Sequence, residues 1–380
     1  MNDRSAIVIG AGIAGLATAR ALAVRGYKVT VIERNEKAIG ASIRNFGMIW
    51  PIGQPDGELY EAAMNSRSIW KQICDEASIW YDQAGSLHVA YSRDEFKVLE
   101  ELKEIYNERG YAILNPDEIG GRSSVTIQNG LIGGLYSDQE LIVDPRIAIA
   151  KIPEWLTEKY KIDFLWNRTV TDICFPAVFI GNESFEADEI FLCSGADFET
   201  LYPQVYGTLP LTKCKLQMMR MMKQSKRIGP SLCGALSLAH YTSFKAAASL
   251  TDLKKRFAEE LPEYLKWGIH VMVSQNQDGE LTIGDSHEYG LTHDPFDKQF
   301  INQLIIDYLK KFARFENETI TETWNGIYPK LTDGSNYLVL EPESGVTIIN
   351  GFGGAGMTLS FGFCEQLFTK RKTLTFSRVD

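Results

Sequence analysis

Three glycines close to the N-terminus, Gly10, Gly12 and Gly15, have the Gly-x-Gly-x-x-Gly spacing of a dinucleotide-binding loop. In such a loop the first glycine makes a tight turn, the second lets a pyrophosphate approach the backbone, and the third lets a helix pack on a strand. Glu33 follows 18 residues after Gly15, where its carboxylate can accept hydrogen bonds from ribose hydroxyls. The pattern therefore predicts a nucleotide cofactor, and both FAD and NAD fit it.

The residues on either side of this loop favour the strand–helix–strand unit that the site requires. Ser5 to Ile9 is a short apolar run typical of a buried parallel strand, and Tyr27 to Ile32 is again apolar and β-branched. Ile13 to Val24, between them, is rich in helix formers. The N-terminus of that helix would point its N–H groups at the phosphates.

The rest of the chain supplies further strands and helices. Between Leu209 and Thr323 strand-like runs alternate with helices, which predicts an antiparallel sheet with helices on one side. Strands are expected over Gly85 to Tyr91, Phe164 to Cys174, Ile190 to Cys193, Leu216 to Met222, His270 to Ser274, Leu281 to Gly284 and Val346 to Ile349. Helices are expected over Glu58 to Ala77, Asp94 to Arg109, Asp144 to about Lys159, Leu250 to Phe257, Phe296 to Phe312 and Met357 to about Lys370.

Composition narrows the class of protein. The 380 residues suffice for two domains, and 44% hydrophobic and 23% charged residues are typical of a globular chain. The formal net charge of −10 argues against a general nucleic-acid surface. The uncharged stretch from Ser344 to Cys364 contains six glycines, so we expect no membrane span there. The flank Met1 to Arg4 does not have the character of a targeting signal.

The spacing of cysteines and histidines indicates neither disulfides nor a metal site. The six cysteines include no Cys-x-x-Cys pair, and no two of the five histidines lie three or four residues apart. We therefore expect buried reduced thiols, a cytoplasmic protein and no bound metal.

Other segments extend the pattern along the chain in order. They are Glu33-Arg34 followed by Gly40-Ala41-Ser42 and Arg44-Asn45, then Arg168-Thr169-Val170, Ile190 to Gly195, Trp324 to Pro329 with Asp333-Gly334, and Gly351 to Thr358. In this combination the chain resembles the D-amino-acid oxidase superfamily of FAD enzymes, which includes glycine oxidase and monomeric sarcosine oxidase. Apart from Gly351 to Gly356, which belongs to the C-terminal motif, the sequence has no second Gly-x-Gly-x-x-Gly, which argues against the reductases and monooxygenases that also bind NADPH.

The resemblance implies how FAD would be held. The segment after Glu33 would wrap the pyrophosphate and ribityl chain, although a simple polar loop is the alternative interpretation of Gly40 to Asn45. N–H groups of the Gly351 to Thr358 motif would stabilise negative charge on the reduced flavin. The residues expected to bind the cofactor are Gly10, Gly12, Ile13, Ala14, Gly15, Glu33, Arg34, Ser42, Arg44, Asn45, Val170, Ser194, Gly195, Gly326, Gly353, Gly354, Ala355, Gly356, Met357 and Thr358.

The fold implied is α/β, with an FAD-binding Rossmann-like domain of the glutathione-reductase type and an inserted substrate domain of antiparallel sheet plus helices. The FAD-binding domain is expected over residues 1–84, 144–208 and 324–380, and the substrate domain over residues 85–143 and 209–323.

The chain departs from the superfamily where a substrate carboxylate is usually clamped. Tyr328 replaces the arginine of the usual Trp-x-Gly-x-Arg-Pro segment, and a tyrosine donates one hydrogen bond rather than a fork. An anion would then be held by separate donors, with Lys330, Lys215, Lys213, Arg44 and His240 as candidates. The run from Ser42 to Gln54 also resembles a narrower subgroup proposed to oxidise aminophosphonates related to 2-aminoethylphosphonate. Since no cysteine lies shortly after Trp324, where sarcosine oxidases attach flavin, we expect non-covalent FAD.

The predicted activity is oxidation of a small amine, by oxidative deamination or N-demethylation, with O2 or an electron carrier as acceptor. Hydride would leave the α-carbon for the flavin, and water would hydrolyse the iminium. Candidate catalytic residues are Lys215, as a positive charge that speeds reoxidation by O2, together with Tyr328 and His240. Candidate substrate contacts are Phe46, Trp50, Tyr241 and Lys330.

Alternatives stay open at several of these positions. Phe46 and Trp50 fit core packing equally well, His240-Tyr241 fits a buried polar pair, and Asp285-Ser286-His287 fits a turn after a strand. Two other functions also fit the motifs. One is an FAD dehydrogenase of an amino acid or hydroxy acid that passes electrons to a carrier, and the other is a non-catalytic FAD-binding protein.

Overall fold

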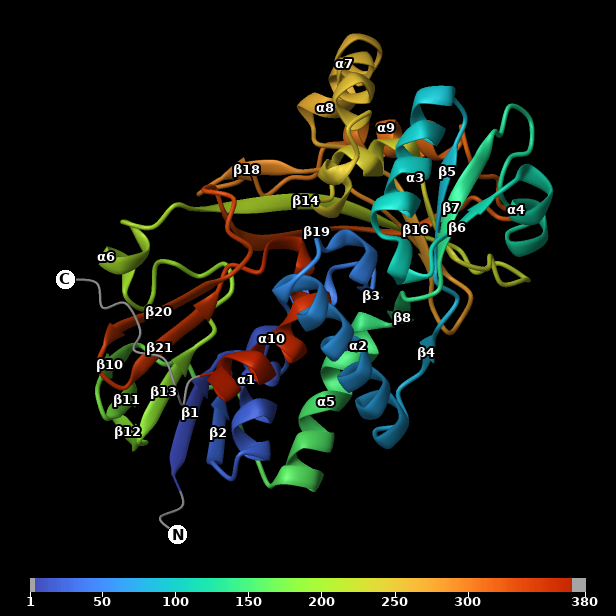
Figure 1. Cartoon of the computed structure of the whole chain (residues 1–380). Helices are drawn as coiled ribbons and strands as arrows, with labels where there is room; N and C mark the ends of the chain where they lie inside the picture. Colours follow the sequence, from blue (N-terminus) through green and yellow to red (C-terminus); the bar gives the residue numbers. More distant parts are fainter. Residues whose placement is uncertain (1–3, 371–380) are drawn as a thin grey trace.

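A six-stranded sheet organises one half of the protein in the computed structural model, which describes residues 4–370 (Figure 1). The flank Met1 to Asp3 considered above lies outside the described residues. Neighbouring strands are parallel except at one edge, where β20 and β21 are antiparallel. The strand order is β20 (Leu338–Glu343), β21 (Val346–Asn350), β13 (Glu189–Leu192), β1 (Ser5–Ile9), β2 (Lys28–Ile32) and β9 (Asp163–Leu165).

Both faces of this sheet are covered, which explains why its strands are nearly all apolar. Side chains alternate along β1, so Ala6 and Val8 pack among the helices while Ile7 and Ile9 pack on the opposite face. The helices are α1 (Ile13–Val24), α2 (Glu58–Glu76), α5 (Pro145–Tyr160) and α10 (Gly356–Lys370). The opposite face carries a three-stranded antiparallel sheet of β10 (Asp172–Cys174), β11 (Ala177–Ile180) and β12 (Glu183–Glu186).

A nine-stranded sheet organises the other half (Figure 1). All its pairs are antiparallel except β5 with β15, so the sheet expected to be antiparallel is mixed. Its order is β18 (Glu288–Gly290), β14 (Leu211–Met221), β17 (Leu281–Gly284), β16 (Met272–Gln275), β15 (Ser231–Cys233), β5 (Ser86–Ala90), β7 (Gly133–Ser137) and β6 (Ala112–Leu114), with β19 (Ile320–Leu331) paired to β14. The parallel pair joins strands that are far apart in the sequence, as a parallel pair requires a long connection.

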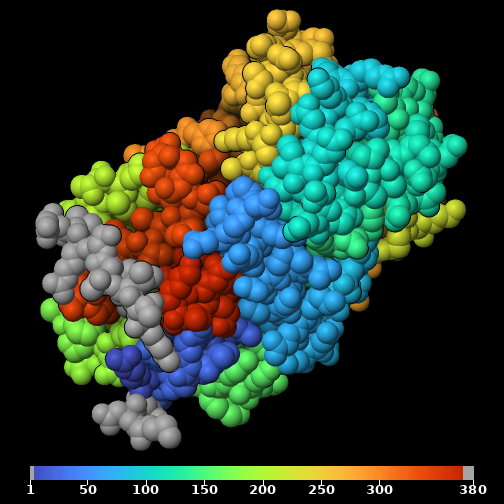
Figure 2. Space-filling model, in the orientation of Figure 1, coloured from blue at the N-terminus to red at the C-terminus, as the bar shows by residue number. Residues whose placement is uncertain are grey.

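Shorter elements complete the two halves. The remaining helices are α3 (Arg93–Ile105), α4 (Pro116–Arg122), α6 (Pro203–Tyr206), α7 (Leu250–Glu260), α8 (Pro262–Lys266) and α9 (Gln299–Leu309). A small sheet joins β3 (Met48–Ile49), β8 (Leu141–Val143) and β4 (Tyr81–Asp82). On the face shown in Figure 2, blue N-terminal and red C-terminal residues lie against one another, so the two ends of the chain build the same half.

The structure corrects some local predictions. The strand expected over Phe164 to Cys174 is two strands in different sheets, because the chain turns at Asn167, whose φ is +56°. All six cysteines are free as expected, but Cys174 is exposed rather than buried. The long strand β19 crosses the proposed domain boundary between residues 323 and 324, so the five-segment division remains a proposal. Within residues 4–370 no helix has both the length and the apolar composition needed to cross a bilayer.

Candidate active site

Two adjoining cavities lie where the halves meet. The inner cavity, of about 300 Å³, is enclosed by the N-termini of α1 and α10 and by parts of β14, β16 and β19. The outer cavity, of about 890 Å³, extends over the carboxyl ends of β1, β2 and β13. The two cavities share the lining residues Gly12, Ala41, Ser42, Arg44, Cys193, Gly195 and Pro329. Together they form one long site at the strand ends where α/β proteins bind nucleotides.

The glycine loop fits a dinucleotide. Gly10 has a φ of +104°, and a Cβ there would lie 2.5 Å from the Cys193 carbonyl oxygen. A Cβ on Gly15 would lie 1.8 Å from the Gly10 carbonyl oxygen, so only glycine lets α1 pack this closely on β1. Gly12 borders both cavities, where its missing side chain leaves the backbone accessible to a phosphate.

The Glu33 carboxylate is buried at the wall of the outer cavity. Oε2 accepts a hydrogen bond from the Ala11 N–H at 2.9 Å, and Oε1 accepts from the Asn35 N–H and amide at 3.0 Å. A carboxylate has about four acceptor positions, so these bonds orient Glu33 and leave positions for ribose hydroxyls.

Other residues that the sequence analysis proposed for the cofactor line the rest of the outer cavity. Val170, Ser194 and Gly195 line it, and Gly195 has a φ of +60°, which glycine adopts without strain. Arg34 also lines it and forms an ion pair with Asp197 at 2.7 Å. Arg34 lies more than 100 positions before the other residues, and the fold brings them to one edge of the parallel sheet.

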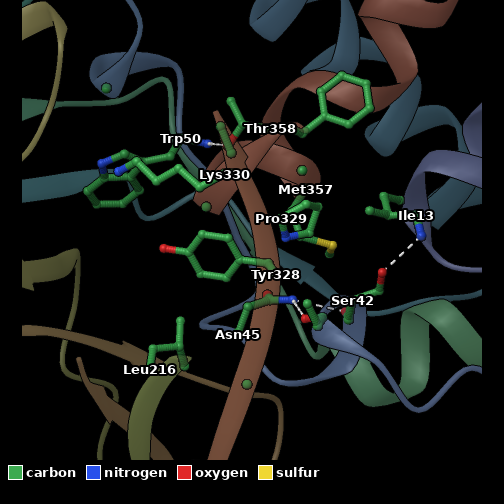
Figure 3. Close-up of a pocket in the computed structure, with 18 of the residues that line it drawn as sticks. Ile13, Ser42, Asn45, Trp50, Leu216, Tyr328, Pro329, Lys330, Met357 and Thr358 are labelled. Atoms are coloured by element: carbon green, nitrogen blue, oxygen red, sulfur yellow. Dashed lines mark hydrogen bonds between the residues drawn. The ribbon is translucent and has the colours of Figure 1, made fainter. Parts of the chain in front are cut away.

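Hydrogen bonds tie the segment from Ala41 to Trp50 to the two helix termini. The Ile13 N–H donates to Ser42 Oγ at 2.9 Å, and the Trp50 N–H donates to Thr358 Oγ1 at 2.9 Å (Figure 3). The Asn45 amide donates to the carbonyls of Ala41 and Ser42 at 3.0 and 2.9 Å. The segment thus runs between both helix N-termini, as a strap around a cofactor would.

The inner cavity wall carries two tyrosines, the buried Tyr328 and the partly buried Tyr241. Burial raises the pKa of both phenols well above the usual value, so both are neutral hydrogen-bond donors at pH 7. In Figure 3 the Tyr328 hydroxyl points into the space that Trp50 and Leu216 also border. Lys330 lies two positions along the same strand and therefore faces the same cavity.

His240 lies in the inner cavity beside two histidines that the sequence analysis did not propose, His270 and His287. Burial lowers the pKa of His240 well below the usual value and that of His287 to about 4, so both rings are neutral at pH 7. Asp285 lines the same wall. Although burial alone would raise its pKa, the two neighbouring imidazoles of His270 and His287 lower it, and the carboxylate stays ionised.

Every residue proposed for the site lines one of the two cavities, with two exceptions among the described residues. Gly15 lies beneath the loop, where it lets α1 pack closely on β1. Lys215 is 2% exposed, and its ammonium contacts the carbonyls of Asp294 and Phe296 at 2.8 Å and Asp297 at 3.3 Å. Lys215 therefore anchors the loop before α9, and we do not retain it as the positive charge beside the flavin.

Sequence reasoning missed His270, Met272, Asp285 and His287 as lining residues. Asp285 and His287 were interpreted as a turn after a strand. Polar residues directly after a buried strand also mark the edge of a sheet where ligands bind, and that signal was present. His270 carried no such signal, because its role depends on the pairing of β16 with β17.

Comparison with protein families gives a match over nearly the whole described chain: the model described as FAD dependent oxidoreductase (DAO) matches residues 5–369. The chain belongs to this family. The oxidoreductase is 24% identical over 251 residues to a D-amino acid dehydrogenase of Helicobacter pylori (strain ATCC 700392 / 26695), a match that covers 51% of this chain and 60% of that relative.

Solved structures share the fold of the oxidoreductase. A glycine oxidase from Bacillus cereus ATCC 14579 has a TM-score of 0.77 at 17% identity, with 98% of this chain and 96% of that chain covered. An L-proline dehydrogenase from P. horikoshii has a TM-score of 0.77 at 21% identity, with 98% and 94% covered. These likenesses support the fold, and the family match assigns the chain to the FAD dependent oxidoreductases.

Proposed function

We propose that this oxidoreductase uses non-covalently bound FAD to oxidise a small amine that carries a phosphonate, related to 2-aminoethylphosphonate. The observation that carries the proposal is Tyr328, which stands on the inner cavity wall at the position where an arginine is expected for an α-amino carboxylate. The other hydrogen-bond donors on that wall belong to separate side chains at different places along it.

The charges around the inner cavity support an anion of tetrahedral shape. Arg44 and Lys330 are the arginine and lysine that line it, and Arg44 donates to the Asn325 carbonyl at 3.1 Å. Lys330 therefore has the more available positive charge, while Tyr328 supplies a neutral donor on the same face of β19. A planar carboxylate is best held by a fork, whereas point donors at different angles suit three phosphonate oxygens.

The apolar walls would hold the amine in place. FAD, when bound, supplies the two-electron acceptor for a hydride from the α-carbon. Trp50, Leu216 and Met218 border the inner cavity and exclude water from the reacting end of the substrate. Orientation and dry walls are the contributions that such a reaction needs from the protein.

The cysteines support non-covalent attachment. Cys193 lines both cavities, but its thiol lies 3.7 Å from Thr18 Oγ1, and burial raises its pKa to about 12. A thiol in that state is a poor nucleophile.

Anaerobic reduction of the bound flavin is the direct test. The full-length protein is mixed with 2-aminoethylphosphonate, its N-methyl and 1-hydroxy derivatives, glycine, D-alanine, sarcosine and L-proline. We expect an aminophosphonate to reduce the flavin fastest. Faster reduction by glycine, D-alanine or sarcosine would overturn the phosphonate assignment, and no reduction by any amine would favour a non-catalytic FAD protein.

Readmission of air after reduction separates an oxidase from a dehydrogenase. Rapid reoxidation with formation of hydrogen peroxide indicates an oxidase. Slow reoxidation in air that an artificial electron carrier accelerates indicates a dehydrogenase.

A further inference from the structure

Three imidazoles converge on one side of the inner cavity, and we call His240, His270 and His287 the histidine cluster. His240 follows a 3-10 turn over Ala235–Ala239, His270 precedes β16, and His287 lies between β17 and β18. One ring nitrogen from each lies within 4.8 Å of the other two, and the ring centroids are 3.9 to 5.2 Å apart.

We propose that the histidine cluster binds one divalent transition-metal ion of the zinc type, with a coordination position open to the cavity. Three neutral imidazoles are a common ligand set for such an ion, and sites of this kind keep a fourth position for water or substrate. The proposal rests on the cluster itself and not on the identity of the amine.

In two of the rings one nitrogen lies against a protein oxygen, and we assign the other nitrogen to the metal. His287 Nδ1 lies 2.9 Å from the Gly268 carbonyl oxygen, which leaves Nε2 free as a ligand. His270 Nε2 lies 3.0 Å from Asp285 Oδ1, which leaves Nδ1. Metal-binding histidines usually hydrogen-bond their second nitrogen to a carbonyl or carboxylate, which fixes the ring and its tautomer, and the Gly268 carbonyl meets this condition for His287.

His270 is the member of the cluster whose ring nitrogens most need a bonding partner. Its side chain is 3% exposed, and neither ring nitrogen makes a hydrogen bond of good geometry with the described residues. A buried polar group without a partner is costly, and a metal ion at Nδ1 would remove that cost.

The cluster has to contract to close around an ion. Zinc–nitrogen bonds of about 2.0–2.1 Å in a tetrahedron place ligand nitrogens about 3.4 Å apart, against distances of up to 4.8 Å here. The rings are inclined by 15–34° to one another and would also have to rotate, for which His240, only half-buried, has the most room.

Local charge is compatible with a cation. Lys330 lines the same cavity and opposes a second positive charge, but the buried Asp285 carboxylate lies against His270 and 3.9 Å from His287. The open position would then accept an oxygen atom of an anionic ligand, next to the wall where Tyr328 and Lys330 already stand.

The test uses the metal alone. The FAD-loaded full-length protein is stripped with a chelator, dialysed against Zn²⁺ or Co²⁺, and assayed for metal per chain and for the visible absorption of bound Co²⁺. We expect one ion per chain and a Co²⁺ spectrum typical of four-coordination by nitrogen and oxygen. We expect H270A and H287A to lower the affinity by more than about 100-fold, and D285N by about 10–100-fold, as for residues that orient a ligand.

A matched control and a second variant within the histidine cluster keep the outcome decisive. H293A removes a histidine outside the cluster and is expected to retain the ion, with bound FAD reporting that each variant is folded. If H270A loses its flavin, H240Q tests the same site at its half-buried member. Absence of bound ion in the stripped and reloaded wild type would overturn the proposal, as would equal binding by wild type and all cluster variants. Because no amine is used, failure of the phosphonate assignment leaves this result unaffected.

Discussion

Lys330 is the side chain with which the phosphonate proposal can be tested most sharply. Its ammonium lies 3.4 Å from the Tyr289 hydroxyl and 5.2 Å from the centroid of that ring, and the structure gives it no carboxylate partner among residues 4–370. In K330M the aliphatic stem is nearly preserved while the charge is removed. The variant should therefore fold and bind FAD as the wild type does, since a half-exposed contact with one ring contributes about 0.5–1 kcal/mol.

The effect on turnover follows from the lost contact with the anion. A charge-assisted hydrogen bond contributes about 1.5–3 kcal/mol, which corresponds to about a 10- to 150-fold loss in kcat/KM. The loss should be confined to substrates with a phosphonate. For propylamine, which lacks the anion, the rate of flavin reduction should fall by less than about threefold, because only the small change in cavity shape affects this substrate.

Stopped-flow anaerobic reduction of wild type and K330M with 2-aminoethylphosphonate and with propylamine provides the comparison. K245M is the matched control, since Lys245 is exposed near His240 but does not line the inner cavity. Equal losses for both amines in K330M would show that the lysine shapes the cavity without binding an anion. A loss in K245M as large as in K330M would show that the effect is long-range electrostatics, and either result would refute the reasoning.

Three further outcomes are expected. In G15A the new Cβ would lie 1.8 Å from the Gly10 carbonyl oxygen, so FAD content and melting temperature should fall. In the control G121A the new Cβ meets nothing within 4 Å, so the variant should keep its FAD and gain up to about 1 kcal/mol of stability. Flavin absorbance measures the FAD content and thermal melts measure the stability. Acid precipitation should leave the flavin in the supernatant, and flavin in the pellet would mean a covalent bond. R256M should lower the free energy of unfolding by about 1 kcal/mol at pH 7, as read from urea titrations, because Arg256 contacts Asp94 at 2.6 Å. Burial alone would raise the pKa of Asp94, but the contact with Arg256 lowers it. The stability difference between wild type and R256M should therefore be fully present above the ordinary carboxyl pKa and shrink as the pH falls through the lowered pKa of Asp94.

The nucleotide half of the site could be predicted from sequence because its signals are local. A glycine that must approach another backbone atom has no substitute, so Gly10 and Gly15 mark the loop wherever the chain goes afterwards. The apolar strand before them and Glu33 after them follow at distances set by one helix and one strand. The parallel sheet then accounts for the segments near Val170 and Gly195, since parallel strands end at a common edge.

The substrate half depended on contacts that sequence spacing does not reveal. Lys215 was a reasonable candidate in a strand, yet strand alternation and the loop before α9 bury it away from the cavity. His270 and His287 show no metal-like spacing because they flank different strands, and the antiparallel pairing of β16 with β17 brings them together.

By itself, the sequence determined the cofactor class, the α/β fold and the glycine loop between β1 and α1, because close approach of backbone to backbone restricts residue type at each position. Only the tertiary structure decided which side chains line the inner cavity. The inner cavity is bounded by β14, β16 and β19, whose register determines which of two alternating faces each residue occupies. A shift of one residue would exchange those faces, and no local pattern in the chain specifies that register.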